Sequence, residues 1–571
     1  MQRILLTLLF LPFFLTISAQ TEKKILILHT NDIHSRLNGY PRESTYSPLI
    51  TGNDETMGGF SRIAGILKTE KNANPGITLT VDAGDFLEGT LFYTLEAQTG
   101  FQLRLMKKMG FDLVCIGNHE FEFGPEKLAG IINKSALNGP IPRILSGNAV
   151  FNSTDPMDDG LEKLHSSEII SRRLIIDRDG LRIGFFSLLG VNAADVAPSA
   201  SPVKFSKQIP FAREMVKELK SEKCDIIICV SHSGVSKDKY GKWSGEDVKL
   251  AESVWGIDVI ISGHTHTKLD KPIIINGIPV VQAGENGQYV GRMSLTLLNG
   301  KLRLDDYNLI PVDDNIMGDV EIEELIKGQQ DLITSDILSP LGIKYSDPVG
   351  ETDFQLDFDI NGDLKASNLG PMVADAIHYY VNKHSSEGCD VSMVAAGVIR
   401  DKLVPGVLSA PDIFSVMSLG SGSDNIPGYP LARLYVTGKE LKNILEILQV
   451  AYKSTPDNYC YYSGLKVEYD PGKGLLKKLS KIEILRSDGS IKKVDFSKKD
   501  KTLYSITANS YMLEFVGIIK KMSFGLINVV PKDSSGNPVT DMKNAVIDMN
   551  GSVPGIQEGK EWLALLEFIS S

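Results

Sequence analysis

The first half of the chain contains a spaced series of carboxylate, amide and imidazole side chains, which are donors that hold divalent cations in proteins. The series consists of Asp32, His34, Asp85, Asn118, His232, His264 and His266. A lone histidine is more often a core or surface residue than a ligand. Here, however, the last two histidines form Gly-His-Thr-His, whose glycine permits a tight backbone beside bound ions. The series therefore predicts the site of a two-metal hydrolase.

Two ions about 3.5–4 Å apart need a bridging carboxylate, terminal ligands and open positions for water and a phosphoryl oxygen. Asp85 is the predicted bridge. The remaining ligands divide into two sets: Asp32, His34 and His266 for one ion, and Asn118, His232 and His264 for the other. Mixed oxygen and nitrogen donors suit zinc, manganese, iron, cobalt or nickel, and the sequence does not choose among them.

Nearly all of these residues lie just after apolar runs typical of β-strands. The runs are residues 25–29, 77–81, 113–116, 226–230 and 257–261. Helix-like stretches such as 98–109 and 208–222 lie between them, so the pattern predicts an α/β fold. In such folds sites lie beyond the carboxyl ends of the strands, and we expect the ligand-bearing loops to converge on one rim. His165, His378 and His384 lack this context and are assigned no role.

The motifs around these residues resemble those of a known family. They are Thr30-Asn31-Asp32-Ile33-His34, Asp82-Ala83-Gly84-Asp85, Gly117-Asn118-His119-Glu120-Phe121, Ser231-His232 and Gly263-His264-Thr265-His266. Together they resemble the calcineurin-like metallophosphoesterases, specifically the secreted 5′-nucleotidase branch, and residues after about 345 look like that branch's C-terminal substrate domain. The resemblance implies an N-terminal four-layer α/β/β/α domain and a second α/β domain, joined by a connecting helix.

The resemblance also implies a catalytic pair. His119 would contact the phosphate beside the metals and stabilise or protonate the departing oxygen. Its partner in the family is an acid three positions further on, usually aspartate, and this chain has Glu122 there. The implied mechanism is in-line attack on phosphorus by a metal-activated hydroxide.

Substrate motifs in the second half only partly match the family pattern. Arg400 ends a loop that binds substrate in relatives, and a second arginine expected before Asn368-Leu369-Gly370 is missing, with only Lys365 nearby. The family also sandwiches a nucleobase between two aromatic rings. Tyr459 and Tyr511 lie at or near those positions, and their alternative role is that of ordinary half-buried strand residues.

Length and apolar patterning predict two folded domains and a leader. Residues 1–19 form a signal peptide, with a short basic start, an apolar run over 4–17 and a small residue for cleavage. The predicted metallophosphoesterase domain spans 20–311. A linker region follows at 312–346, with a one-sided helix over 320–333, and the C-terminal substrate domain spans 347–571.

The net charge narrows the possible functions of the protein, and the predicted signal peptide narrows its location. The chain of 571 residues has a formal net charge of −11, which argues against a binder of nucleic-acid polymers, since such binders present a basic face. We expect an exported protein, periplasmic or extracellular, without a stable membrane span. The sequence leaves the oligomeric state open.

The predicted function is hydrolysis of nucleoside 5′-monophosphates or related nucleotides by an enzyme with two divalent ions. One alternative keeps this chemistry on UDP-sugars, 2′,3′-cyclic nucleotides or a non-nucleotide phosphoester, and the altered C-terminal motifs favour it. A catalytically weak, metal-dependent binding protein is a second alternative, favoured by Glu122 and the missing arginine.

Overall fold

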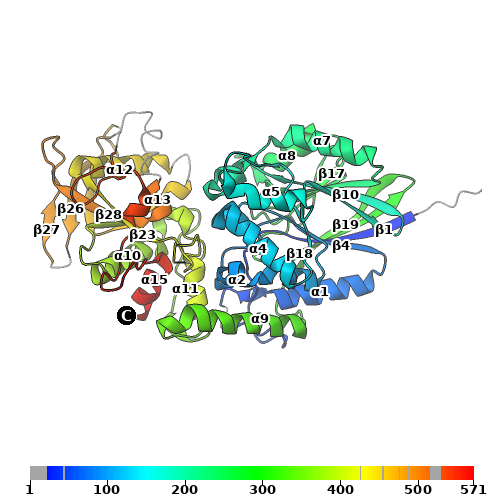
Figure 1. The fold of residues 1–571 in the computed structure, drawn as a ribbon, viewed down its shortest axis with the longest axis horizontal. Helices are drawn as coiled ribbons and strands as arrows, with labels where there is room; N and C mark the ends of the chain where they lie inside the picture. Colours follow the sequence, from blue (N-terminus) through cyan, green and yellow to red (C-terminus); the bar gives the residue numbers. More distant parts are fainter. Residues whose placement is uncertain are drawn as a thin grey trace, which may run out of the picture.

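The structure, a computed structural model, describes residues 22–42, 45–424, 426–452, 456–474, 476–486, 489–514 and 529–571. The signal peptide predicted for residues 1–19 lies outside the described residues. No helix in the described ranges is long and apolar enough to cross a membrane. Two domains lie side by side, and the C-terminus belongs to the second (Figure 1).

The first domain is built on two β-sheets. One has the order β19 (Lys301–Pro311), β18 (Tyr289–Leu298), β1 (Glu22–Thr30), β4 (Ile77–Asp82), β5 (Leu113–Cys115), β6 (Arg143–Leu145) and β8 (Ile170–Ser171). The other has the order β16 (Ile273–Ile275), β17 (Ile278–Val281), β15 (Val259–Ser262), β12 (Ile226–His232), β10 (Leu181–Leu189) and β9 (Arg173–Arg178). The strands that precede the predicted ligands therefore belong to two sheets: β1, β4 and β5 to one, and β12 and β15 to the other.

The sheets pack face to face because their strands are apolar on both faces. In β1, Ile25 and Ile27 enter the core between the sheets, which also contains Phe185 of β10 and Ile228 of β12. The alternate residue Leu28 faces the outer helices instead. This alternation follows from the two-residue repeat of a strand.

Helices cover both outer faces. α1 (Phe60–Ala73), α3 (Phe101–Met109) and α4 (Gly124–Asn138) pack on the sheet that contains β1. α7 (Gln208–Ser221) and α8 (Glu246–Ser253) pack on the other, where Phe211, Met215 and Leu219 of α7 repeat every four residues along one buried stripe. The order helix, sheet, sheet, helix confirms the predicted four-layer α/β/β/α domain (Figure 1).

A helix connects the domains, as the sequence predicts. α9 (Val320–Ile333) begins at Asp319, whose side chain accepts hydrogen bonds from the backbone N–H groups of Glu321 and Ile322. Its buried residues Ile322 and Ile326 face the first domain, where α9 contacts α1 and α3. The one-sided apolar spacing is thus explained by packing along the first domain.

The second domain is a smaller α/β unit. Its central sheet has the order β23 (Leu431–Thr437), β28 (Leu503–Asn509), β21 (Val391–Ala395) and β24 (Cys460–Ser463). A second sheet consists of β25 (Leu465–Tyr469), β26 (Leu479–Leu485) and β27 (Ile491–Lys493), and β20 (Pro348–Thr352) pairs with β22 (Gly406–Ser409). The principal helices are α10 (Leu369–His384), α11 (Ala410–Val416), α12 (Gly438–Ala451) and α15 (Glu561–Ser570). The second α/β domain is confirmed.

Candidate metal centre

Two clusters of ligand atoms form where the strands of the first domain end. One consists of Asp32, His34 and His266, and the other of Asp85, His232 and His264. Within each cluster, one potential ligand atom from each residue lies within 4.8 Å of the others. The first cluster has the residues of one predicted ligand set, and the second has His232 and His264 of the other together with the predicted bridge, Asp85.

The amide of Asn118 lies at the second cluster. Its Oδ1 is 3.1 Å from Nε2 of His232, and the same nitrogen is 2.9 Å from Oδ2 of Asp85. The two clusters also meet, since Asp32 Oδ1 lies 3.9 Å from His232 Nε2 and 3.7 Å from His266 Nε2. The structure thus brings all seven predicted ligands to one place, although they come from two sheets.

Backbone strain marks this place. Asp32, His34, Asp85, His264 and His266 all have positive φ, at 50°, 52°, 54°, 76° and 52°. Such angles are uncommon for residues other than glycine and persist only where surrounding contacts enforce them. In one of these contacts, the backbone N–H of His264 donates a hydrogen bond to Asp32 Oδ1 at 2.9 Å. Ligand-bearing loops of both sheets are therefore locked to one another.

Glycines allow the close approach of these loops. A Cβ on Gly117 would lie 2.3 Å from Oδ1 of Asp85, and a Cβ on Gly263 would lie 2.9 Å from Nδ1 of His232. The motif glycines are thus explained by the lack of room between neighbouring ligands.

Buried carboxylates that the sequence analysis missed support the ligands. Glu120 accepts hydrogen bonds from the backbone N–H groups of Gly117 and Asp85, at 2.6 and 3.1 Å. Asp247 accepts from the hydroxyls of Ser231 and Ser262, both at 2.6 Å, and so ties together the ends of β12 and β15. Glu120 stands within a quoted motif, but Asp247 has no signal in the sequence because its partners come from distant segments.

Outer partners orient the histidine rings. Nδ1 of His266 lies 2.6 Å from Glu285 Oε2, and Nδ1 of His232 lies 2.8 Å from the carbonyl of Ala83. In both rings Nε2 is left to face the clusters. Rings held in this way are typical of metal-ligating histidine. Glu285 was not predicted from the sequence.

The ionisation states of several predicted ligands suit the binding of cations. Burial lowers the pKa of His34 well below its usual value and that of His264 to about 3, so both rings stay neutral, as ligands must. Asp85 is buried, which would raise its pKa, but His232 and His119 outweigh burial and hold it well below its usual value. An ionised carboxylate among imidazoles fits divalent transition ions.

The predicted catalytic pair lies beside the clusters. Nδ1 of His119 is 3.4 Å from Oε1 of Glu122, and its backbone N–H donates to Asp85 Oδ1 at 2.8 Å. A further carboxylate, Glu88, places Oε2 3.5 Å from the same Nδ1 and is only 1% exposed. Burial would lower the pKa of His119, but Asp85, Glu122 and Glu88 raise it to about 9. Glu88 was not predicted, and its role comes only from the geometry.

The second domain brings Arg400 to the same region. Burial and, to a smaller extent, the positive charge of Arg400 act to lower the pKa values of His34, His119 and His266, although nearby carboxylates raise those of His119 and His266 above their usual value. The neighbouring Asp401 forms an ion pair with Arg36 of the first domain. The charge of Arg400 thus acts on the ligand clusters across the domain boundary.

The two predicted base-binding rings have separate aromatic neighbours. Tyr511 stacks on Tyr429, with ring centroids 5.2 Å apart and planes inclined by 10°. Tyr459 contacts Tyr452 and Tyr461 edge-on, at 5.4 and 5.1 Å. A shared role of Tyr459 and Tyr511 in holding one base stays a prediction.

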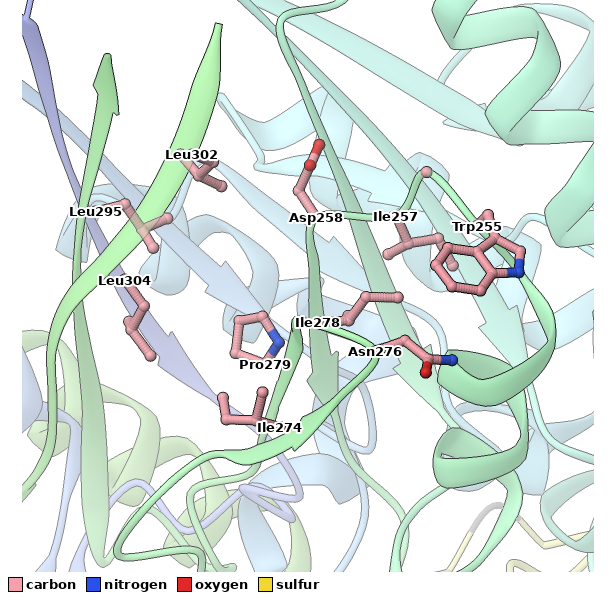
Figure 2. Close-up of a pocket in the computed structure, with 12 residues that line it drawn as sticks. Trp255, Ile257, Asp258, Ile274, Asn276, Ile278, Pro279, Leu295, Leu302 and Leu304 are labelled. Atoms are coloured by element: carbon pink, nitrogen blue, oxygen red, sulfur yellow. The ribbon is translucent and has the colours of Figure 1, made fainter.

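A cavity of about 400 Å³ lies elsewhere (Figure 2). Its walls include Leu295 and Leu304 from one sheet and Ile278 from the other, and Asp258 lies at its edge just before β15 begins. The ligand His264 follows the opposite end of β15. The cavity contains none of the predicted ligands and is not the candidate site.

Comparison with known proteins agrees with this geometry. Residues 25–268 match the calcineurin-like phosphoesterase family, and residues 348–517 match the 5′-nucleotidase C-terminal domain family. The 5′-nucleotidase of Vibrio vulnificus (strain CMCP6) is 28% identical over 499 residues, which are 80% of this chain and 81% of that protein. The trifunctional nucleotide phosphoesterase protein YfkN of Bacillus subtilis (strain 168) is 27% identical over 453 residues, or 74% of this chain, which spans only 27% of that longer protein.

A solved structure shares the fold. The 5′-nucleotidase precursor from Thermus thermophilus superposes with a TM-score of 0.67, covering 96% of both chains at 19% sequence identity. The likeness extends over both domains and the connecting helix.

Proposed function

The chain belongs to the calcineurin-like phosphoesterases that carry a 5′-nucleotidase C-terminal domain, and on this premise we propose that it is an exported dimetal enzyme, which hydrolyses nucleoside 5′-monophosphates to nucleosides and inorganic phosphate. Membership of the family makes it a metal-dependent phosphoester hydrolase. The observation that carries the proposal is the convergence of two ligand clusters, His119 and Arg400 where the domains meet.

The ligand sets would hold two divalent ions. Asp32, His34 and His266 would bind one, Asn118, His232 and His264 the other, and Asp85 both. Zinc, manganese or similar transition ions suit these donors. When bound, such ions lower the pKa of water and neutralise charge on the phosphoryl group.

His119 would act on the leaving group. Its Nδ1 faces the carboxylates of Glu122 and Glu88, so Nε2 is the nitrogen left for the substrate. A protonated imidazole in this place can stabilise or protonate the oxygen that departs from phosphorus. The charge of the nearby carboxylates favours the protonated ring.

Arg400 would grip the phosphate from the other domain. A guanidinium offers two parallel N–H donors that match two phosphate oxygens. The ion pair of Asp401 with Arg36 holds the arginine's loop against the first domain. The phosphate would thus be bound between the domains, with its charge shared by ions on one side and arginine on the other.

The Arg400→Ala variant should bind every phosphate-bearing substrate more weakly, because the guanidinium contacts only the anion. We expect KM to rise about 10- to 100-fold for both adenosine monophosphate and phenyl phosphate, which corresponds to the loss of hydrogen bonds to a charged group. Steady-state kinetics would test this, with Arg213→Ala as control, since Arg213 is exposed and donates to the Ser253 carbonyl. An unchanged KM for both substrates would show that Arg400 does not bind the phosphate.

Replacing Tyr459 and Tyr511 together by alanine should raise KM for adenosine monophosphate much more than for phenyl phosphate. Base stacking is worth about 1–3 kcal/mol per ring, and the small aryl ester has no base to lose. Tyr511 also stacks on Tyr429, so its replacement affects more than base binding. The decisive measurement is therefore the comparison of KM between the two substrates. Equal losses on both substrates would indicate a structural role for the rings and favour a non-nucleotide phosphoester.

A panel of substrates would test the proposed function itself. Phosphate release is measured with nucleoside monophosphates, UDP-sugars, 2′,3′-cyclic nucleotides and phenyl phosphate in the presence of zinc or manganese. The proposal expects the monophosphates to have the highest kcat/KM. The missing arginine before Asn368 favours the other phosphoesters as a second candidate, and the name of the Bacillus subtilis relative describes a nucleotide phosphoesterase with three functions. Activity on none of the panel would reject both.

Export is supported by the start of the chain. Residues 1–3 contain a basic residue, 4–17 are apolar, and small residues follow at 18 and 19, which is typical of a secretory signal peptide. The proposed location is periplasmic or extracellular.

A further inference from the structure

A tyrosine of the second domain contacts the catalytic pair of the first. The hydroxyl of Tyr429 donates a hydrogen bond to Oε2 of Glu122 at 2.9 Å. The other oxygen of that carboxylate, Oε1, lies 3.4 Å from Nδ1 of His119. Glu122 therefore joins Tyr429 to His119 through its two oxygens, across the boundary between the domains.

Tyr429 is held in place by its own loop. Its ring stacks on Tyr511, and its backbone N–H donates to the carbonyl of Leu419 at 3.0 Å. Gly420 has φ +77°, and a Cβ there would lie 2.3 Å from the tyrosine ring. The ring thus occupies space that any other residue at position 420 would fill, so its hydroxyl is presented to Glu122 from a fixed direction.

The same loop is anchored to the first domain. The hydroxyl of Tyr93 lies within hydrogen-bonding distance of the carbonyl oxygens of Ser418 and Gly420, at 2.7 and 2.9 Å. The ring of Tyr93 also contacts Phe123, the residue after Glu122, with centroids 5.4 Å apart. The backbone around Tyr429 is therefore tied to the segment that carries the catalytic pair.

The carboxylate of Glu122 needs such a partner. Its side chain is 12% exposed and has two rotatable methylene groups. Its Oε1 lies 3.4 Å from Nδ1 of His119, and among the described residues that Nδ1 has no hydrogen-bond partner, so the ring does not fix the carboxylate through a hydrogen bond. A hydrogen bond on one oxygen restricts rotation of the group and keeps the other oxygen facing the ring. Glu88 contacts Nδ1 from a second direction, at 3.5 Å, and does not restrain Glu122.

We propose that Tyr429 is a positioning residue for His119, acting through Glu122, so that the second domain completes the catalytic pair when the domains are arranged as in this structure. The inference rests on the proposed function, because it assumes that His119 assists the leaving group. The two oxygens of Glu122 face the imidazole and the tyrosine hydroxyl separately.

The test is Tyr429→Phe, which keeps the stack on Tyr511 and removes only the hydroxyl. For phenyl phosphate we expect kcat to fall about tenfold, the rate equivalent of one hydrogen bond to a charged group, while KM changes by less than about twofold. The loss should be smaller for 4-nitrophenyl phosphate, whose leaving group needs less help from a proton donor. Bound metal, measured by elemental analysis, should stay at the wild-type value.

The control is Tyr46→Phe, which removes another half-buried tyrosine hydroxyl, one that lies 2.8 Å from Ser61 Oγ in the first domain. It should leave kcat unchanged. A second arm repeats Tyr429→Phe in a Glu122→Ala background. If Tyr429 acts through Glu122, its effect there should shrink from about tenfold to less than about twofold.

The outcomes separate the two proposals. Wild-type kcat in Tyr429→Phe, or the same fold-loss in both backgrounds, would overturn the positioning role while leaving the proposed function intact. An equal loss for phenyl and 4-nitrophenyl phosphate would overturn it too, since a role through His119 must depend on the leaving group. No turnover by the wild-type enzyme on any phosphoester would instead reject the proposed function, and this role with it.

Discussion

The Asp85→Asn variant should lose bound metal and activity together. Oδ2 of Asp85 lies 2.9 Å from Nε2 of His232 in the second cluster, and Oδ1 accepts the backbone N–H of His119. Asp85 is the residue proposed to hold both ions. Asparagine keeps the shape and one oxygen but removes the charge that balances two divalent cations. Changing even an outer-shell partner typically costs about 10- to 100-fold in metal affinity, and a bridging ligand should cost more.

Elemental analysis after dialysis would measure this loss. We expect about two equivalents in the wild-type protein by the two-metal mechanism and fewer than one in the variant, with turnover reduced in parallel. The control is Asp258→Asn, because Asp258 accepts the Ile227 N–H at the far end of β15 and contacts no predicted ligand. If a folded Asp85→Asn variant retained two equivalents of metal, the assignment of Asp85 as the bridging ligand would be wrong.

The His119→Asn variant should keep its metal and lose its activity. The backbone N–H of His119 donates the 2.8 Å hydrogen bond to Asp85, which the substitution preserves, and its ring lies edge-on to that of His34, with centroids 5.3 Å apart. The imidazole itself faces Glu122 and Glu88, where it would serve the leaving group. We expect kcat to fall by about 10²-fold or more, as is usual for the loss of a general acid or an electrostatic stabiliser.

Comparing metal content with kcat would distinguish this role from ligation. His384→Asn provides the control, because His384 is also an imidazole beside a carboxylate, Glu567, but lies in the second domain with no assigned role. It should retain both metal and kcat. Full activity in a metal-replete His119→Asn variant would mean that the role belongs to another residue.

Local patterns in the sequence were sufficient to predict the elements and the candidate ligands. The run at 226–230 lies within β12, and the one-sided helix predicted over 320–333 is α9 (Val320–Ile333). His232 occupies the last position of β12 instead of the loop that follows. Such agreement is expected because strand and helix periodicities, and the residue types that bind cations, are properties of short segments.

Contacts between distant segments depended on the tertiary structure. The sequence predicts one rim of loops, but the packing of two sheets is what brings Asp32 and Asp85 to His232 and His264. The supporting carboxylate Glu285 looks like any surface glutamate until the fold places it 2.6 Å from His266. Its partner lies 19 positions earlier, in the loop that follows β15.

In the second domain, too, the sequence identifies candidate groups and the tertiary structure decides which of them meet. The sequence identifies Arg400 and the aromatic residues as candidates, since a guanidinium binds phosphate and a flat ring stacks on a base wherever each is placed. Tyr429 attracts no notice in the sequence. Its hydroxyl reaches Glu122, 307 positions away, only because the two domains meet there. Residue type and spacing determined which groups could do the chemistry, and long-range packing decided which of them hold one another in position.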